Sequence, residues 1–238
     1  MKILAFDSTA KAASVAVTEN ERLLGVYNID NGLTQSELLL PMAENLLRSL
    51  RLTFSDIELV AASVGPGSFT GVRIGAALVK GIAFGKNIPC AAVSTLEALA
   101  ENLFPLVGYI VPVMDARRGQ VYSATFKSDG KTMTRLTPDR AVSIDQLADE
   151  LADLGEDIYL SGDGYDVTAK GLLEKGVSFR ETPSLLITEN AYSVARLAYR
   201  QCCNGKTVTD SEISATYLRL PQAERERLEK INREKKDN

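Results

Sequence analysis

The sequence predicts an α/β protein built from two related domains, and three observations support this fold class. The chain has 238 residues, enough for two domains of roughly 100 residues each. Its first half places apolar and amphipathic segments in the order βββαβαβα. A second series of strands begins near residue 109 and again runs strand, hairpin, alternating strand, so we interpret the chain as a duplicated unit with a reduced second copy.

The first domain is expected over residues 1–105. Its predicted strands cover residues 2–7, 14–18, 23–29, 56–64 and 88–93. Its predicted helices cover residues 34–51, about 71–84 and 95–104. Thr34, followed three residues later by Glu37, has the capping-box pattern of a helix start. Pro41 should kink this helix or mark its true start.

The second domain is expected over residues 106–220. Its predicted strands cover residues 109–115, 120–127, 132–136 and 157–160, and its predicted helices cover 143–154, 167–175 and 188–203. The last of these helices could pack back on the first domain. Residues 221–238 carry charges of both signs at nearly every position and are interpreted as a solvated tail.

The composition excludes several functional classes. The net charge is −4, so a nucleic-acid contact would need a local basic patch or a basic partner. No apolar run reaches the roughly 18 residues of a membrane span, and the first strand is too short for a signal-peptide core. Three cysteines without a framework pattern indicate a reducing compartment, so we expect a cytoplasmic protein. The chain has no histidine, which excludes Ser-His-Asp and Cys-His hydrolases and histidine-ligated metal sites.

Two loops have the residue types that bind phosphate. At the end of the first strand, the turn pairs a carboxylate with hydroxyl groups in Asp7, Ser8 and Thr9. A glycine-rich loop then joins a buried strand to a helix, a geometry that favours an anion at the helix N-terminus. Its candidate residues are Gly65, Gly67, Ser68 and Thr70. The alternatives are an ordinary Asx-type turn and a tight strand–helix turn, because no Walker lysine follows.

Several runs resemble one bacterial family, TsaB, also called YeaZ. They include the long stretch GPGSFTGVRIG at residues 65–75 and STLEALA at 94–100. Shorter matches are DST at residues 7–9, SELLLP at 36–41, DARR at 115–118 and YLR at 217–219. Gln35 departs from the family, in which a histidine usually precedes the Ser-Glu-Leu run.

The resemblance implies an actin-like (ribonuclease H-like) fold and a role in making threonylcarbamoyladenosine at position 37 of tRNAs that read codons starting with A. It implies a non-catalytic subunit that pairs with the catalytic TsaD, works with the ATPase TsaE, and forms a homodimer when alone. The relative TsaD carries a His-x-x-x-His pair where this chain has Thr95 and Leu99. No metal site or required cofactor is therefore expected, although weak nucleotide binding is allowed.

Two helices are the expected partner surface. The helix over 34–51 has an apolar arc of roughly 200°, wider than a helix packed on one domain needs, and either a neighbouring helix of the same chain or a partner could cover the surplus. The next helix carries two glycines four residues apart, which implies a closely packed neighbour within the chain or in a partner. The predicted interface residues are Leu39, Met42, Leu46, Gly71, Gly75 and Val79.

Two other functions compete with the subunit hypothesis. An independent actin-like ATPase or small-molecule kinase would need small residues in the second domain's phosphate turn, where Arg117 and Arg118 stand instead. A metallopeptidase would need ligands that a chain without histidine can supply only as carboxylates.

Overall fold

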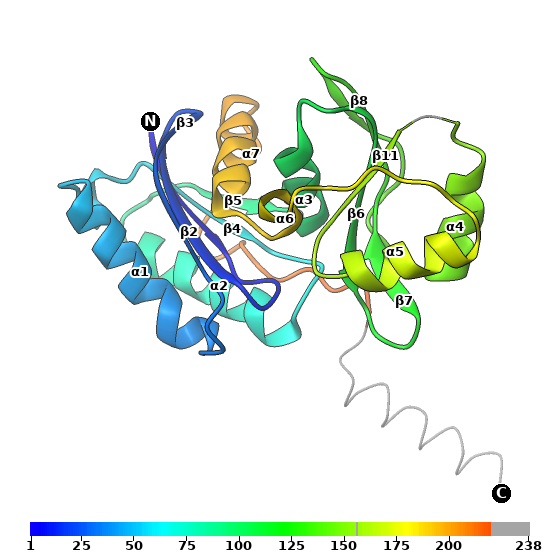
Figure 1. The fold of residues 1–238 in the computed structure, drawn as a ribbon. Helices are drawn as coiled ribbons and strands as arrows, with labels where there is room; N and C mark the ends of the chain where they lie inside the picture. Colours follow the sequence, from blue (N-terminus) through cyan, green and yellow to red (C-terminus); the bar gives the residue numbers. More distant parts are fainter. Residues whose placement is uncertain (156, 220–238) are drawn as a thin grey trace, which may run out of the picture.

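A computed structural model describes residues 1–155 and 157–219, which form two α/β domains on either side of one helix, α3 (Figure 1). The first domain has the predicted order βββαβαβα, with one additional 3₁₀ turn. Its elements are β1 (Lys2–Asp7), β2 (Ala13–Glu19), β3 (Arg22–Ile29), α1 (Gln35–Ser49), η1 (Phe54–Asp56), β4 (Leu59–Ser63), α2 (Phe69–Ala83), β5 (Cys90–Val93) and α3 (Thr95–Leu103).

The sheet of the first domain has the order β3-β2-β1-β4-β5. β1 is antiparallel to β2 and parallel to β4, and β4 is parallel to β5. Helices α1 and α2 cover one face of this sheet, and α7 (Ala191–Cys203) covers the other (Figure 1). Because both faces are covered, β4 is buried at every position, which explains its continuous apolar sequence.

Helix α1 begins where the capping pattern predicts. The Glu37 carboxylate accepts a hydrogen bond from the Thr34 backbone amide at 3.0 Å. The helix then continues through Pro41, whose side chain is exposed, so Pro41 does not mark the helix start. Residues that follow the apolar face of α1 pack on the sheet beneath it, and the opposite face remains in solvent.

The second domain has more and shorter strands than the sequence suggests. Its elements are β6 (Val107–Asp115), β7 (Gln120–Ser123), β8 (Phe126–Asp129), β9 (Met133–Arg135), β10 (Arg140–Ser143), α4 (Ile144–Ala152), β11 (Ile158–Ser161), α5 (Tyr165–Glu174), α6 (Ser184–Ile187) and α7. In this sheet β6 pairs along one edge with β7 and then β8, both antiparallel to it, and along its other edge with β11, which runs parallel to it.

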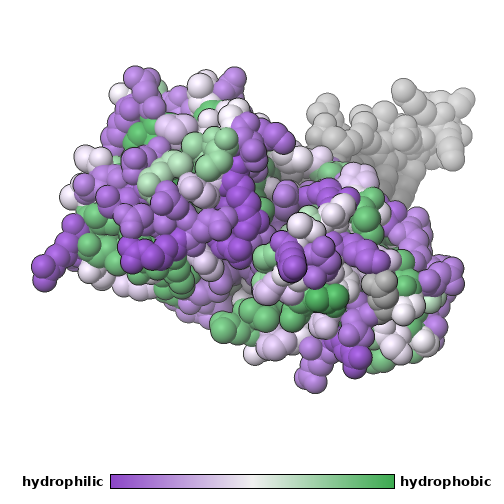
Figure 2. Space-filling model, turned by 90° about the horizontal axis from the view of Figure 1, so that it is seen from above, coloured by the Kyte–Doolittle hydropathy of each residue, from purple (hydrophilic) through white to green (hydrophobic). Residues whose placement is uncertain are grey.

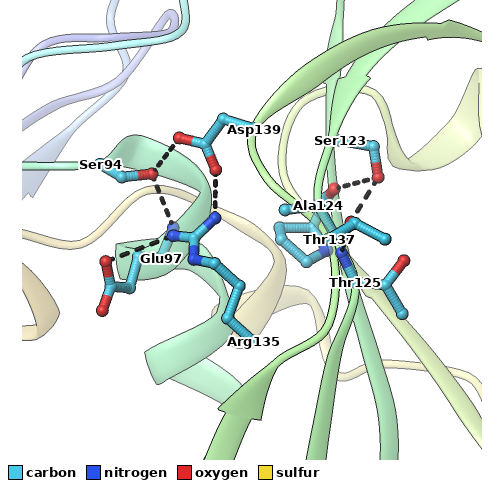
Figure 3. Close-up of polar contacts among 9 residues, drawn as sticks. Ser94, Glu97, Ser123, Ala124, Thr125, Arg135, Thr137 and Asp139 are labelled. Atoms are coloured by element: carbon cyan, nitrogen blue, oxygen red, sulfur yellow. Dashed lines mark hydrogen bonds and ion pairs between the residues drawn. The ribbon is translucent and has the colours of Figure 1, made fainter.

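The predicted strand over 120–127 is interrupted at Ala124. β7 and β8 keep one register against β6, with Val113 opposite Ser123 and Ile110 opposite Phe126. This register puts Ala124 opposite Pro112, which has no amide to donate to the ladder. At the break, the Ser123 hydroxyl donates to the Pro112 carbonyl (2.9 Å), and Figure 3 shows the neighbouring side chains.

The interruption explains how the second sheet relates to the first. β7 and β8 together act as one strand, with β10 paired to the first half and β9 to the second half. If β7 and β8 are counted as the second strand, β9 and β10 as the third and β11 as the fourth, the strand order of this sheet is 3-2-1-4. The first domain has the same order followed by a fifth strand. The α/β fold of two related units, the second reduced, is therefore confirmed.

Helix α7 returns from the second domain to the first sheet. It begins at Ala191 rather than at residue 188, because the Asn190 side chain caps it by accepting from the Tyr192 amide at 2.9 Å. Val194 and Ala198 pack in the same cluster as Ile3 and Ala5 of β1. The predicted charged tail over 221–238 lies outside the described residues.

A polar network joins the start of α3 to the second domain (Figure 3). The Ser94 hydroxyl caps α3 by accepting from the Glu97 amide (3.2 Å) and donates to Asp139 Oδ2 (2.5 Å). Arg135 binds both Asp139 and Glu97. The two domains are therefore held together by charged groups at this end of α3. No helix in the described part of the chain is long and apolar enough to cross a membrane.

Candidate functional site

A cleft of about 450 Å³ lies where the first strands of the two domains end. It is lined by the turn after β1, the loop before α2, the turn after β6, the loop after β11 and the segment 216–219. The lining residues are Thr9, Ala10, Lys11, Gln35, Pro66, Gly67, Ser68, Phe69, Met114, Asp115, Ala116, Arg117, Tyr122, Asp163, Thr216, Tyr217, Leu218 and Arg219.

The turn after β1 is built around a buried carboxylate. Asp7 accepts hydrogen bonds from the Thr9 amide (3.0 Å), the Thr9 hydroxyl (2.7 Å) and the Ser63 hydroxyl (2.6 Å). Burial raises the pKa of Asp7, and these hydrogen bonds partly oppose the increase. The Asp7 carboxylate is thus occupied within the turn and does not face the cleft.

The glycine-rich loop before α2 packs directly on this turn. The Ser68 amide donates to the Thr9 carbonyl at 2.7 Å, and the Ser68 hydroxyl caps α2 at the Gly71 amide. A Cβ atom on Gly71 would lie 1.8 Å from the Ser8 carbonyl oxygen, so only glycine allows this approach. The loop therefore holds the first turn in place as well as bordering the cleft.

The structure brings together three of the seven predicted phosphate-loop residues. Thr9, Gly67 and Ser68 line the cleft. The other four do not line it: Asp7, Ser8 and Gly65 are buried behind it, and Thr70 is exposed outside it.

The matching turn of the second domain is open to solvent. Asp115 accepts from the Arg117 amide at 2.7 Å and pairs with the Arg117 guanidinium at 3.1 Å. Arg117 and Arg118 both have positive φ, 66° and 57°. Asp163, from the loop after β11, accepts from the Asp115 amide at 3.0 Å, and burial raises its pKa. The second turn thus places a long arginine side chain, Arg117, at the cleft, where the first turn places small residues.

The segment 216–219 crosses the cleft and contacts both domains. The Thr216 amide donates to the Val64 carbonyl (2.7 Å), and the Tyr217 ring lies 4.9 Å from the Phe69 ring on α2. Arg219 reaches the second domain, where its guanidinium donates to the Ala116 carbonyl at 2.7 Å. In the sequence, only the family resemblance of residues 217–219 singled this segment out.

A buried acid that the sequence analysis missed lies next to the first turn. Burial, with the nearby charges of Asp7 and Asp163, raises the pKa of Glu189 to about 8. Its Oε1 has no hydrogen-bond partner in the described part of the chain. Glu189 precedes α7, and no local sequence pattern marks it, because its surroundings come from both domains.

The six predicted interface residues are buried inside this chain. Leu39, Met42, Leu46 and Val79 belong to the core beneath α1 and α2. Gly71 and Gly75 face the Ser8 turn, since a Cβ on Gly75 would lie 2.8 Å from the Ser8 hydroxyl oxygen. The wide apolar arc and the glycine pair are therefore explained by packing within the chain, and a partner could meet only other residues of these helices.

Comparison with known proteins identifies the family. Residues 33–202 match the family described as "TsaD: tRNA N6-adenosine threonylcarbamoyltransferase". The tRNA threonylcarbamoyladenosine biosynthesis protein TsaB of Bacillus subtilis is 35% identical over 66% of this chain and 67% of its own length. The TsaB of Escherichia coli is 31% identical over 92% of this chain and 95% of its own length. The chain belongs to the TsaB family.

Solved structures agree with the family and the fold. A Pseudomonas aeruginosa protein described as similar to peptidase YEAZ superposes with a TM-score of 0.76 at 26% identity, covering 92% of this chain and 99% of its own. Component A of the Acidaminococcus fermentans (R)-2-hydroxyglutaryl-CoA dehydratase superposes with a TM-score of 0.50 at 12% identity, covering 85% and 99%. The TsaB-family chain thus has the predicted actin-like fold.

Helix α3 lies at the place where the resemblance puts the histidine pair of TsaD. Thr95 and Leu99 are both buried on α3, at the positions that the resemblance aligns with the histidine pair of TsaD. Within residues 1–155 and 157–219, no three His, Cys, Asp or Glu side chains are grouped so that they could hold a metal ion.

Proposed function

We propose that this TsaB-family chain is a non-catalytic accessory subunit that pairs with TsaD, which transfers a threonylcarbamoyl group to adenosine 37 of tRNAs reading codons that start with A. The observation that carries the proposal is the pair of buried, non-ligating residues Thr95 and Leu99 on α3, in a chain without histidine. A subunit of this kind contributes a binding surface, and its partner supplies the reacting groups.

The outer face of α2 is the surface that best suits a partner helix. Arg73, Ala77 and Gly81 recur every four residues on this face, and all three are exposed. A Cβ on Gly81 would have no heavy atom within 4 Å. Of these three, Ala77 and Gly81 are small and let a second backbone approach closely, while Arg73 lies at the end of the stripe against Phe69 and Tyr217. A helix of TsaD, or of a second copy when the chain is alone, therefore fits at the Ala77–Gly81 end.

Size-exclusion chromatography with light scattering tests the proposal on the chain alone and mixed with TsaD from the same organism. We expect a homodimer that converts to a 1:1 heterodimer. Gly81→Leu should prevent both associations and leave the monomer folded, because leucine favours a helix by roughly 1 kcal/mol over glycine. Gly81→Ala is the matched control and should pair normally. A mixture that never associates, even with TsaE and nucleotide, would overturn the subunit proposal.

We further infer that tRNA meets this chain only within the complex and that the chain is cytoplasmic. The net charge of −4 supports the first inference, because a free acidic chain repels a polyanion. TsaE is expected to join the TsaD-bound form. A filter-binding assay that detects tRNA on the isolated chain at physiological salt would contradict the first inference.

A second candidate function is nucleotide binding in the cleft without hydrolysis. The supporting observation is that Thr9, Gly67 and Ser68 face the same space as the cations Lys11 and Arg117. Asp7, the carboxylate best placed to assist hydrolysis, is buried and already hydrogen-bonded. Calorimetry with ATP should therefore show weak binding that Lys11→Ala/Arg117→Ala abolishes, and no phosphate release. Steady phosphate release would favour the independent ATPase instead.

A further inference from the structure

A second pocket, separate from the cleft, lies between the two domains beside α3 and α7. Its volume is about 590 Å³, within the range of small-molecule sites. Its walls come from the β2–β3 turn, α3, the β8–β9 turn, α7 and the residues after α7. The lining residues are Glu21, Glu97, Glu101, Phe104, Lys131, Thr132, Met133, Arg196, Leu197, Arg200, Gln201, Asn204 and Lys206. We call it the α3–α7 pocket.

Figure 2 looks down on the side of the molecule where α7 and β8 stand in Figure 1. Hydrophilic side chains border the boundary between the two lobes on this face. The lining of the α3–α7 pocket includes polar groups of both domains, such as Glu21 of the first, Arg200 of α7, which packs on the first sheet, and Lys131 and Thr132 of the second.

A buried carboxylate organises the pocket. The Glu101 side chain is only 1% exposed, and it pairs with Arg196 Nη1 at 2.8 Å and Arg200 Nη2 at 3.0 Å. Arg200 Nε also donates to Glu21 at 2.8 Å, so every nitrogen of that guanidinium faces a carboxylate. Removing Glu101 from water is costly, and two fixed arginines compensate for it. The arginines are thus held in place before any ligand arrives.

The pocket has more cationic donor groups than its carboxylates use. Each lining carboxylate already has an arginine: Glu101 and Glu21 as above, and Glu97 through Arg135 at 3.3 Å. Arg196 has no hydrogen-bond partner for its other two nitrogens within the described residues. The ammonium groups of Lys131 and Lys206 likewise have no ion pair there. The two ammonium groups and the remaining Arg196 nitrogens are therefore available to bind an anion.

The charge balance and the apolar wall of the pocket indicate which class of anion it can bind. The lining residues carry four cations and three carboxylates, a balance that suits one phosphate better than a long polyanion. Phe104 and Met133 add an apolar wall, and the Arg196 guanidinium lies 5.9 Å from the centre of the Phe104 ring. An aromatic ring beside a phosphate site can stack a planar base.

We propose that the α3–α7 pocket binds a mononucleotide, with its phosphate on Arg196, Lys131 and Lys206 and its base against Phe104 and Met133. The ligand touches both domains, because Lys131 and Met133 lie in or next to the β8–β9 turn and Arg196 lies on α7. Binding would hold the two domains together at this edge. The proposal does not depend on pairing with TsaD, and its test uses the chain alone.

Isothermal titration calorimetry with AMP, inorganic phosphate and adenosine tests the proposal on the full chain. We expect AMP to bind more tightly than phosphate, and adenosine not to bind. Lys131→Ala/Lys206→Ala should weaken AMP binding at least tenfold, and it should not affect folding because these ammonium groups make no ion pair or hydrogen bond within the described residues. Lys86→Ala/Lys170→Ala, which removes the same charge elsewhere on the surface, is the matched control and should bind AMP normally.

The cleft variant Lys11→Ala/Arg117→Ala separates the two pockets and should also bind AMP normally. A loss of AMP binding in the cleft variant instead of the Lys131/Lys206 variant would overturn the proposal. Equal binding by all variants, or no binding of AMP at millimolar concentration, would overturn it as well. Phe104→Ala should weaken AMP binding but leave phosphate binding unchanged, and the opposite pattern would contradict the stacking role.

Discussion

The two domains place an aspartate at the end of their first strands, but the turns that follow have opposite surroundings. Asp7 is buried beneath the loop before α2, with all its hydrogen bonds made inside the first domain. Asp115 lies on the cleft wall, next to an exposed arginine that pairs with it. The same element order thus produces a buried turn in the first domain and a solvent-exposed turn in the second. The difference arises because the loop before α2 packs on the first turn.

The largest expected effect concerns the close packing on the first turn. Gly71→Val would place its Cβ in the Ser8 carbonyl, so we expect more than about 4 kcal/mol of lost stability or failure to fold. Gly119→Ala is the comparison in the second turn. Gly119 has φ +70° and open space around it, so only the backbone conformation is strained, at about 1–2 kcal/mol. Chemical denaturation measures both, and equal losses would contradict the contrast.

The next effect concerns Glu189, the buried acid behind the first turn. In the folded chain Glu189 keeps its proton up to about pH 8, whereas its ordinary pKa is 4.5. The folded state therefore binds the extra proton, and stability should fall as pH rises from about 4.5 to about 8, by up to about 1.4 kcal/mol per pH unit. Glu189→Gln should remove this dependence and stabilise the chain at pH 8. Parallel stability–pH curves for the two proteins would contradict the burial effect.

A smaller effect should separate the two aspartates directly. Ser63→Ala removes a donor from buried Asp7, and we expect a loss of about 1–3 kcal/mol. Arg117→Ala removes the partner of Asp115, whose ion pair is exposed to solvent, and should change stability by less than about 0.5 kcal/mol. Urea denaturation of both variants checks the pair. A larger loss for Arg117→Ala would mean that the second turn is as structural as the first.

The smallest effect concerns Gln35, the residue that departs from the family. Its side-chain nitrogen donates to the carbonyls of Ala10 (2.8 Å) and Lys11 (3.3 Å) and so holds the end of the first turn. Gln35→Ala should cost about 1 kcal/mol in thermal or urea unfolding. If stability does not change, the turn is held by the loop before α2 alone.

The fold could be predicted from the sequence where the signal is local. The capping pair of Thr34 and Glu37, and the apolar runs of β1 and β4, predicted these elements of the first domain correctly. The break in the second sheet could not be found this way. Pro112 was visible, but its effect falls on Ala124, and that pairing requires the register between β6 and its neighbour.

The site was predictable only in part, for the same reason. Thr9, Gly67 and Ser68 were found from short motifs, and they line the cleft. Asp163 and the segment 216–219 reach the cleft through tertiary structure, more than a hundred residues from Thr9. The glycines of α2 show the opposite limit: periodicity detected a close neighbour but could not tell a partner helix from the Ser8 turn.

The return of α7 to the first sheet sets the order in which the chain can mature on the ribosome. The Ala191 amide donates to the Ser14 hydroxyl, a contact between residues 177 positions apart. Until α7 emerges, one face of β1, β4 and β5 lacks its cover, although every strand of that sheet has already been synthesised. The nascent first domain therefore exposes an apolar sheet face to which chaperones can bind. Its core is complete only after the second domain has been synthesised.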